Sequence, residues 1–254
     1  MLQVHQFPCL SDNYCFLIRD DATGCVACID TPDGDAIARQ LDDLGWSLDW
    51  ILNTHWHPDH VGGNTMLKAR YGCRIIGPAH EADRIPGIDQ TVDEGDEVMV
   101  GECRAEVLHT PGHTLGHIVY HFADEHKAFV GDTLFALGCG RLFEGTPEQM
   151  WNSLSRLREW PDDTVIYCAH EYTQANARFA LSVDGDNPAL RERAEAVDAQ
   201  RARGEFTVPT TIALERATNP FLRADDADLQ AAVGMSGAPL PDAFAEIRRR
   251  KDAF

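Results

Sequence analysis

The segment Asn53-Thr54-His55-Trp56-His57-Pro58-Asp59-His60 directly follows an apolar run, residues 50–52, that is typical of a buried strand. Residues two apart in extended backbone point to the same side, so His55 and His57 can share one metal ion. Asp59 and His60, beyond the turn, can face a second. A lone histidine is usually a core or surface residue, but three imidazoles and a carboxylate clustered at a strand end have no packing rationale. The segment therefore predicts a metal site.

Three later segments place further ligand-type side chains near the ends of expected strands. His113 lies in a Pro-Gly turn within residues 109–117, Asp132 follows the run Phe129-Val130-Gly131, and His170 follows Tyr167-Cys168-Ala169. Taken alone, Asp132 would be a turn or helix-capping residue and His170 a surface residue. Their recurrence at strand ends favours further metal ligands.

The pattern of apolar residues divides the chain into two parts. Up to about residue 172, short β-rich runs are interleaved with two helices, and runs of this kind predict two packed sheets with helices outside. Beyond it Ala, Arg, Glu and Leu dominate, which predicts a separate helical domain. The expected strands are 15–18, 25–29, 50–52, 74–76, 105–108, 117–122, 128–130 and 165–167. The expected helices are 34–44, 62–71, 173–183, 189–203, 225–233 and 241–253.

Charge and cysteine content restrict the class of partner and the compartment. The formal net charge of -19 disfavours nucleic acid and anionic membranes as partners, and an anionic substrate must meet a local basic patch. Eight cysteines without regular pairing indicate reduced, mostly buried thiols, and Cys25-x-x-Cys28 reads as strand packing rather than a redox or metal pair. No run approaches the roughly 18 apolar residues of a membrane span, and the first residues lack a signal-peptide pattern. We expect a cytoplasmic protein.

In order along the chain, HxHxDH, TPGHTxGH, GDTLF and AHEYT resemble the metallo-β-lactamase superfamily, over most of the first 172 residues. The resemblance implies an α+β fold, the αββα sandwich, in residues 1–172, followed by a smaller helical domain in residues 173–254. It also implies two metal sites that share the carboxylate of Asp132. One ion is held by His55, His57 and His113, and the other by Asp59, His60 and His170.

Other polar residues near these motifs are not among the seven implied metal ligands. Asp30, at the end of an expected strand, matches the acidic residue that orients the histidine segment in such folds, although a turn-capping role is nearly as compatible with the sequence. His117 is expected to give structural support. The remaining histidines have no ligand types beside them in sequence, and we expect them to be surface or packing residues: His5, His80, His109, His121 and His126.

The resemblance narrows to the glyoxalase II family through the segments 138–146 and 219–223, Tyr172, and the basic ending 247–254. It implies a C-terminal domain that binds glutathione. The side chains expected to contact substrate are Arg141, Phe143, Tyr172, Arg248 and Lys251. Arg248 and Lys251 are three apart and share a helix face. Many relatives carry Lys and Tyr at the positions of Arg141 and Phe143. Compared with them, Phe143 lacks a hydroxyl donor, and Arg141 keeps the charge but changes the geometry of the contact.

The implied reaction is hydrolysis of S-(2-hydroxyacyl)glutathione, specifically S-D-lactoylglutathione, to glutathione and D-lactate, the second step of methylglyoxal detoxification. Two cations about 3.5 to 4 Å apart can hold a bridging hydroxide and polarise the thioester carbonyl. Asp59 and Asp132 are the expected catalytic carboxylates. The expected cofactors are two divalent ions, Zn²⁺ before Fe or Mn. We expect a monomer that binds a small-molecule thioester.

Two alternatives remain open from the sequence. One is a mono-iron glutathione persulfide dioxygenase of the same fold, which uses two histidines and an aspartate. The long C-terminal region and the complete second set of ligands argue against it. The other is a non-catalytic protein that binds metal or glutathione.

Overall fold

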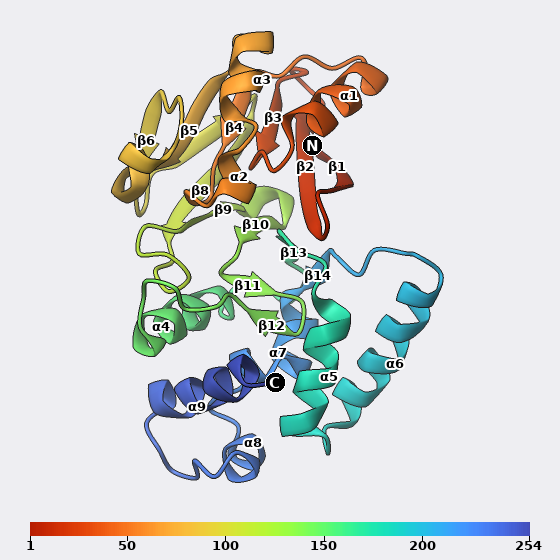
Figure 1. Cartoon of the computed structure of the whole chain (residues 1–254), viewed down its shortest axis with the longest axis vertical. Helices are drawn as coiled ribbons and strands as arrows, with labels where there is room; N and C mark the ends of the chain where they lie inside the picture. Colours follow the sequence, from red (N-terminus) through yellow and green to blue (C-terminus); the bar gives the residue numbers. More distant parts are fainter. The chain divides into compact units, whose positions relative to one another are not determined.

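The computed structural model describes residues 1–254, which form two compact units. Unit 1 comprises Met1–His109 and Gly116–Gly131, and unit 2 comprises Thr110–Leu115 and Asp132–Phe254. Figure 1 shows the chain coloured from the red N-terminus to the blue C-terminus. The domain boundary predicted between residues 172 and 173 lies within unit 2 and stays a prediction.

The first sheet of unit 1 contains six strands in chain order. The first three strands pair antiparallel, and the later ones pair parallel from β3 onward. Pro8 is tolerated within β1 because this strand lies at the edge of the sheet. The strands are β1 (Leu2–Cys9), β2 (Asn13–Asp20), β3 (Val26–Ile29), β4 (Trp50–Leu52), β5 (Arg74–Pro78) and β6 (Gln90–Val92).

Four further strands of unit 1 form an antiparallel meander. They are β7 (Glu97–Val100), β8 (Cys103–His109), β9 (Ile118–Phe122) and β10 (Lys127–Gly131). Phe16 of β2 contacts Phe129 of β10, with ring centroids 5.5 Å apart. One face of the first sheet therefore packs against these strands.

Helices cover the other face of the first sheet. Helix α1 (Gly34–Leu44) buries Ile37 and Leu41, and α3 (Asn64–Tyr71) buries Leu67, in one core with Cys28 and Ile51 of the strands. Because both faces of the sheet are covered, almost every residue of β2 is buried rather than every second one. The short helix α2 (Pro58–Val61) lies between β4 and α3.

Unit 2 is mostly helical. Its strands are β11 (Leu134–Phe135), β12 (Gly138–Cys139), β13 (Val165–Cys168) and β14 (Thr210–Thr211), and its helices are α4 (Pro147–Leu157), α5 (Thr173–Asp184), α6 (Pro188–Ala202), α7 (Ile212–Thr218), α8 (Ala227–Ala232) and α9 (Leu240–Asp252). Helices α5 and α6 pack through small and aliphatic side chains, including Ala180 and Leu190. Trp151 of α4 contacts Phe244 of α9. No helix combines the length and apolar character that a bilayer crossing requires.

The expected elements are confirmed, with ends that differ by a few residues. All eight expected strands are present, α1 has the predicted bounds, and the helix expected from residue 62 begins at Asn64. All eight cysteines are free, and seven of them are buried. Cys28 belongs to the helix-covered core, where burial raises the pKa of its thiol, so core packing is the correct interpretation of this residue.

Candidate active site

The histidine loop, residues 54–60, runs from the end of β4 into α2 in unit 1. Pro58 is the first residue of α2, and His57 before it has φ -57° and ψ 146°, the extended conformation expected before proline. Nε2 of His55 lies 2.9 Å from Nδ1 of His57. His55 and His60 are fully buried, whereas the Asp59 side chain is 38% exposed. The loop therefore gathers imidazole nitrogens inside the unit and leaves one carboxylate partly open to solvent.

Asp30 orients this loop with both carboxylate oxygens. Oδ1 accepts a hydrogen bond from the backbone N–H of Thr54 at 2.8 Å, and Oδ2 accepts one from the Thr54 hydroxyl at 2.8 Å. Oδ2 also lies 2.8 Å from Nδ1 of His60, which directs Nε2 of that ring away from Asp30. Asp30 adopts φ +54°, an uncommon value for a residue other than glycine. The orienting role expected for Asp30 is confirmed.

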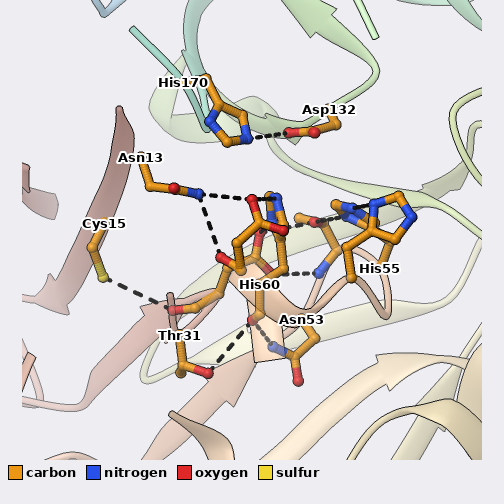
Figure 2. Close-up of polar contacts among 12 residues, drawn as sticks. Asn13, Cys15, Thr31, Asn53, His55, His60, Asp132 and His170 are labelled. Carbon is orange, nitrogen blue, oxygen red and sulfur yellow. Dashed lines mark hydrogen bonds and ion pairs between the residues drawn. The ribbon is translucent and has the colours of Figure 1, made fainter. Parts of the chain in front are cut away.

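Amide and hydroxyl groups hold the end of the loop. The Asn13 side chain donates to Oδ2 of Asp59 at 3.1 Å. Figure 2 shows Thr31 and Asn53 converging on the backbone carbonyl of His60, which accepts from the Asn53 side chain at 3.0 Å and from the Thr31 backbone N–H at 2.8 Å. The sequence carries no sign of these roles, because single Asn and Thr residues near strand ends have no distinctive spacing.

Glu81 is a second anchor that the sequence did not reveal. It lies in the 3₁₀ helix η1 (Ala79–Arg84) and is only 2% exposed. Its Oε2 accepts from the N–H of Trp56 at 2.9 Å, and its Oε1 accepts from the N–H of Gly116 at 2.9 Å. His117, next to Gly116, stacks on His55 at a centroid distance of 4.7 Å, in agreement with the supporting role expected for it. One buried carboxylate thus ties together two segments that are distant in sequence.

The other predicted ligands, His113, Asp132 and His170, lie close together in unit 2. All three are buried. Nε2 of His113 lies 3.3 Å from Oδ2 of Asp132, and Nε2 of His170 lies 3.4 Å from Oδ1 of the same carboxylate (Figure 2). The carbonyl oxygen of Arg141 accepts from Nδ1 of His113 at 2.8 Å when that nitrogen carries the proton. Each carboxylate oxygen therefore faces one imidazole, an arrangement suited to a carboxylate that bridges two cations.

A basic pocket of about 220 Å³ lies within unit 2. Four of the five predicted substrate-contact residues line it, and Phe143 instead packs edge-on against His113 at 5.2 Å. Tyr172 stacks on His170 at 4.7 Å. The pocket is lined by Phe135, Cys139, Arg141, Tyr172, Ala175, Asn176, Arg248 and Lys251.

Positive charge is concentrated in this pocket. Arg248 is 6% exposed, and its buried Nε has no hydrogen-bond partner. Its other nitrogens donate to the Cys139 carbonyl and to Asp252. Burial lowers the pKa of Lys251, and the neighbouring Arg248, Arg178 and Arg141 lower it further. The pocket can therefore stabilise an anion.

Asn219 fixes the wall of the pocket. Its side-chain amide donates to the carbonyl oxygens of Phe135 at 3.2 Å and Gly138 at 2.9 Å, in the hairpin β11–β12. Asn176 donates to the Ala136 carbonyl in the same hairpin at 3.1 Å. The segment 219–223, which the sequence singled out, thus acts by holding the hairpin.

His80 and His109 agree with the surface or packing roles expected of them, and the fold also places a carboxylate beside them. The two rings stack with centroids 4.9 Å apart, and Nε2 of His80 lies 3.2 Å from Oδ2 of Asp93. The sequence separations of 13 and 16 residues hid this group, because η1, a turn and the end of β8 meet only in the fold.

Comparison with known proteins agrees with this arrangement. The family model "Metallo-beta-lactamase superfamily" matches residues 11–170, and "Hydroxyacylglutathione hydrolase C-terminus" matches residues 171–254. Hydroxyacylglutathione hydrolase from Maricaulis maris is 58% identical over 253 residues, covering 100% of this chain and 99% of the relative. The protein of the same name from Methylococcus capsulatus is 51% identical over 254 residues, with coverage of 100% and 99%.

Among solved structures, the crystal structure of ETHE1 from Myxococcus xanthus is similar, with a TM-score of 0.67, 27% identity and 99% coverage of both chains. The fold is the metallo-β-lactamase α+β sandwich with a C-terminal helical part, as the sequence predicted. The chain is an enzyme of the hydrolase class, and it belongs to the hydroxyacylglutathione hydrolase family of the metallo-β-lactamase superfamily.

Proposed function

We propose that this chain hydrolyses S-D-lactoylglutathione to glutathione and D-lactate, the second step of methylglyoxal detoxification, with two divalent metal ions. Family membership supports hydrolysis of S-(2-hydroxyacyl)glutathione. The observation that carries the substrate assignment is the basic pocket, which gathers Arg141, Arg248 and Lys251 in a protein of net charge -19. Glutathione carries two carboxylates, and such a pocket can hold one of them.

The donor groups present fit divalent metal ions. Buried imidazole nitrogens that face one another, and a buried carboxylate between two imidazoles, are groups that a borderline metal ion satisfies well. We propose His55, His57 and His113 for one ion, Asp59, His60 and His170 for the other, and Asp132 for both. When bound, such ions supply a Lewis acid and a water molecule of lowered pKa. Zn²⁺ is our proposed metal, and the same donors accept Fe or Mn.

Residues of the histidine loop have separate tasks in this proposal. Asp30 holds the ring of His60 in one orientation, because it contacts Nδ1 and leaves Nε2 for a ligand. The Asn13 amide holds the carboxylate of Asp59. Asp59, which is partly exposed, accepts a hydrogen bond from the attacking water and orients it. No side chain is required to protonate the leaving group, since a thiol pKa near 8.5 makes its thiolate a good leaving group.

The basic pocket positions the glutathione part of the substrate. Arg141, Arg248 and Lys251 bind the glycine carboxylate, and Tyr172 donates a hydrogen bond. Phe143, without a hydroxyl, contributes apolar contact beside His113. We further propose that residues 1–172 carry the catalytic chemistry and residues 173–254 bind glutathione.

The proposed setting is a cytoplasmic monomer without nucleic-acid or membrane partners. The negative net charge opposes binding to polyanions, and the eight free thiols are compatible with a reducing compartment.

The test is hydrolysis of S-D-lactoylglutathione by the purified protein, followed as loss of thioester absorbance, with and without a chelator. A matched control is S-D-lactoyl-N-acetylcysteamine, which has the same thioester but lacks both glutathione carboxylates. We expect chelator-sensitive turnover and a much higher KM for the control.

Each of the other outcomes contradicts part of the proposal. Equal KM values for the two thioesters would reject the carboxylate pocket. Oxygen uptake with glutathione persulfide, without thioester turnover, would identify the mono-iron dioxygenase. Metal-replete protein that binds glutathione but turns over neither substrate would be a binding protein.

A further inference from the structure

Three ligand-type side chains outside the proposed active site form a second group in unit 1, the Asp93 cluster, composed of His80, Asp93 and His109. One ligand atom from each residue lies within 4.8 Å of the others. Nε2 of His80 is 3.2 Å from Oδ2 of Asp93, and the two imidazole rings are stacked at 4.9 Å. Two imidazoles and one carboxylate at these separations can supply three ligands to a transition-metal ion.

The backbone around Asp93 is fixed by a tight turn. The N–H of Asp93 donates to Oδ2 of Asp96 at 2.8 Å, and the N–H of Asp96 donates to the Asp93 carbonyl at 3.1 Å. Oδ1 of Asp93 accepts from the N–H of Glu94 at 2.7 Å. The carboxylate thus uses one oxygen within its own turn and presents the other to His80.

The two histidines are attached to elements with their own anchors. His80 lies in η1, next to Glu81, whose carboxylate is bound to Trp56 and Gly116. His109 ends β8, and its N–H donates to Oε2 of Glu94 at 2.7 Å. Little reorganisation is needed for the three donors to meet one ion, so the entropic cost of binding is small.

The chemistry of the cluster favours a cation of borderline softness. A transition-metal ion can accept one nitrogen from each ring and one oxygen from the carboxylate at the same time. Neutral imidazoles bind zinc, copper, nickel and cobalt, whereas magnesium and calcium prefer oxygen donors. The carboxylate of Glu94 adds negative charge beside the cluster.

From this geometry we propose that His80, Asp93 and His109 bind a divalent transition-metal ion on the surface of unit 1, in addition to the ions of the active site. His80 is 53% exposed and Asp93 45%, so water completes the coordination and the ion exchanges with solvent. The site is peripheral to catalysis and responds to the free metal concentration.

The test is calorimetric titration of the zinc-loaded holoenzyme with Zn²⁺, in the wild type and in the variants His80→Ala and His109→Ala. The wild type is expected to bind one ion beyond those it already holds. Loss of one ligand should weaken this binding about tenfold or more, since removal of a group that merely supports a ligand already costs that much. In the double variant, His80→Ala with His109→Ala, only this one additional ion should be lost, and the ions of the active site should stay bound.

His5→Ala is the matched control, because His5 is a partly exposed histidine of the same unit whose ring contacts Gln40. It should bind the additional ion like the wild type, and turnover should be unchanged in all of these variants. Absence of an additional ion in the wild type, or equal binding by His80→Ala, His109→Ala and the wild type, would overturn the proposal.

Discussion

The carbonyl oxygen of Arg141 lies 2.8 Å from Nδ1 of His113, while the side chain of Arg141 lines the basic pocket. A backbone acceptor thus orients a predicted metal ligand, and the guanidinium of the same residue, 3.7 Å from Asp252, is the group that we propose binds substrate. Substitution at 141 should therefore affect the proposed contact with substrate and preserve the hydrogen bond to His113, because every residue retains its carbonyl group.

For this reason Arg141→Ala should raise KM for S-D-lactoylglutathione without a comparable loss of kcat. The side chain is 64% exposed, so its contribution is screened and the expected increase is about fivefold. Arg141→Lys keeps a positive charge, so its KM should lie between those of the wild type and Arg141→Ala. Steady-state kinetics with the N-acetylcysteamine thioester supply the control, since KM for that substrate should not change; a fall in kcat alone would contradict the assignment.

Lys251 should give the affinity for substrate a dependence on alkaline pH. Its pKa is lowered, first by burial, so it loses its proton below the ordinary lysine pKa. Because only the ammonium attracts a carboxylate, KM should rise as pH increases through the lowered pKa. Lys251→Met should have a KM about tenfold higher at neutral pH and no such rise. A rise that persists in Lys251→Met would assign it to another group.

The same substitution should stabilise the fold at neutral pH. A lysine pKa that is lower in the folded state means that the unfolded chain binds the proton more tightly. The charged side chain therefore destabilises the folded state below the lowered pKa, and stability increases with pH from there to the ordinary lysine value. Thermal unfolding should show a higher Tm for Lys251→Met at pH 7 and a smaller difference at pH 10.

Asp30→Asn should weaken metal binding while preserving side-chain volume. The amide cannot reproduce the acceptors that Asp30 offers to Thr54 and His60, so metal affinity should fall about ten- to hundredfold. Metal content after dialysis against a graded chelator series measures this loss. Asp35→Asn, an exposed position in α1, is the control, and an unchanged metal content in Asp30→Asn would refute the orienting role.

Asp59→Ala should abolish turnover, because the substitution removes both a proposed ligand and the group that orients water. Asn13→Ala, which leaves the carboxylate but removes its hydrogen bond, should lower kcat more modestly. Single-turnover kinetics on protein of known metal content separate the loss of a metal ligand from the loss of water orientation. Retained activity in Asp59→Ala would remove this residue from the mechanism.

Glu81→Gln should destabilise the protein by about 1–3 kcal/mol. A glutamine has one acceptor oxygen, so its NH₂ group would face the N–H of either Trp56 or Gly116. Urea denaturation should give a lower midpoint, with a parallel loss of metal. The control is Glu106→Gln, at an exposed position in β8, which should unfold like the wild type.

The sequence predicted the elements that carry strong apolar periodicity. It missed β1, whose side chains alternate irregularly between buried and partly exposed positions at the sheet edge. It also missed α4, although Thr146 and Gln149 form a capping box before it and Pro147 occupies its first turn. A capping box followed by proline in the first turn is a sequence signal for the start of a helix at this position.

The sequence can indicate a candidate site where several ligand types are crowded into a few residues. The segment 53–60 is of this kind, and the structure confirms the local contacts among its members. Glu81 and Asn13 could not be found in this way, because they act through hydrogen bonds to partners 25 to 46 residues away. Their roles follow only from the three-dimensional path of the chain.

The groups that shape the histidine loop are the carboxylates of Asp30 and Glu81, the side-chain amide of Asn53 and the backbone N–H of Thr31. None of them needs an ion to make its hydrogen bond. These hydrogen bonds therefore hold the loop in one form without a contribution from metal ligation. A loop held in this way would lose little conformational freedom when an ion binds, so most of the free energy of ligation would remain available for affinity.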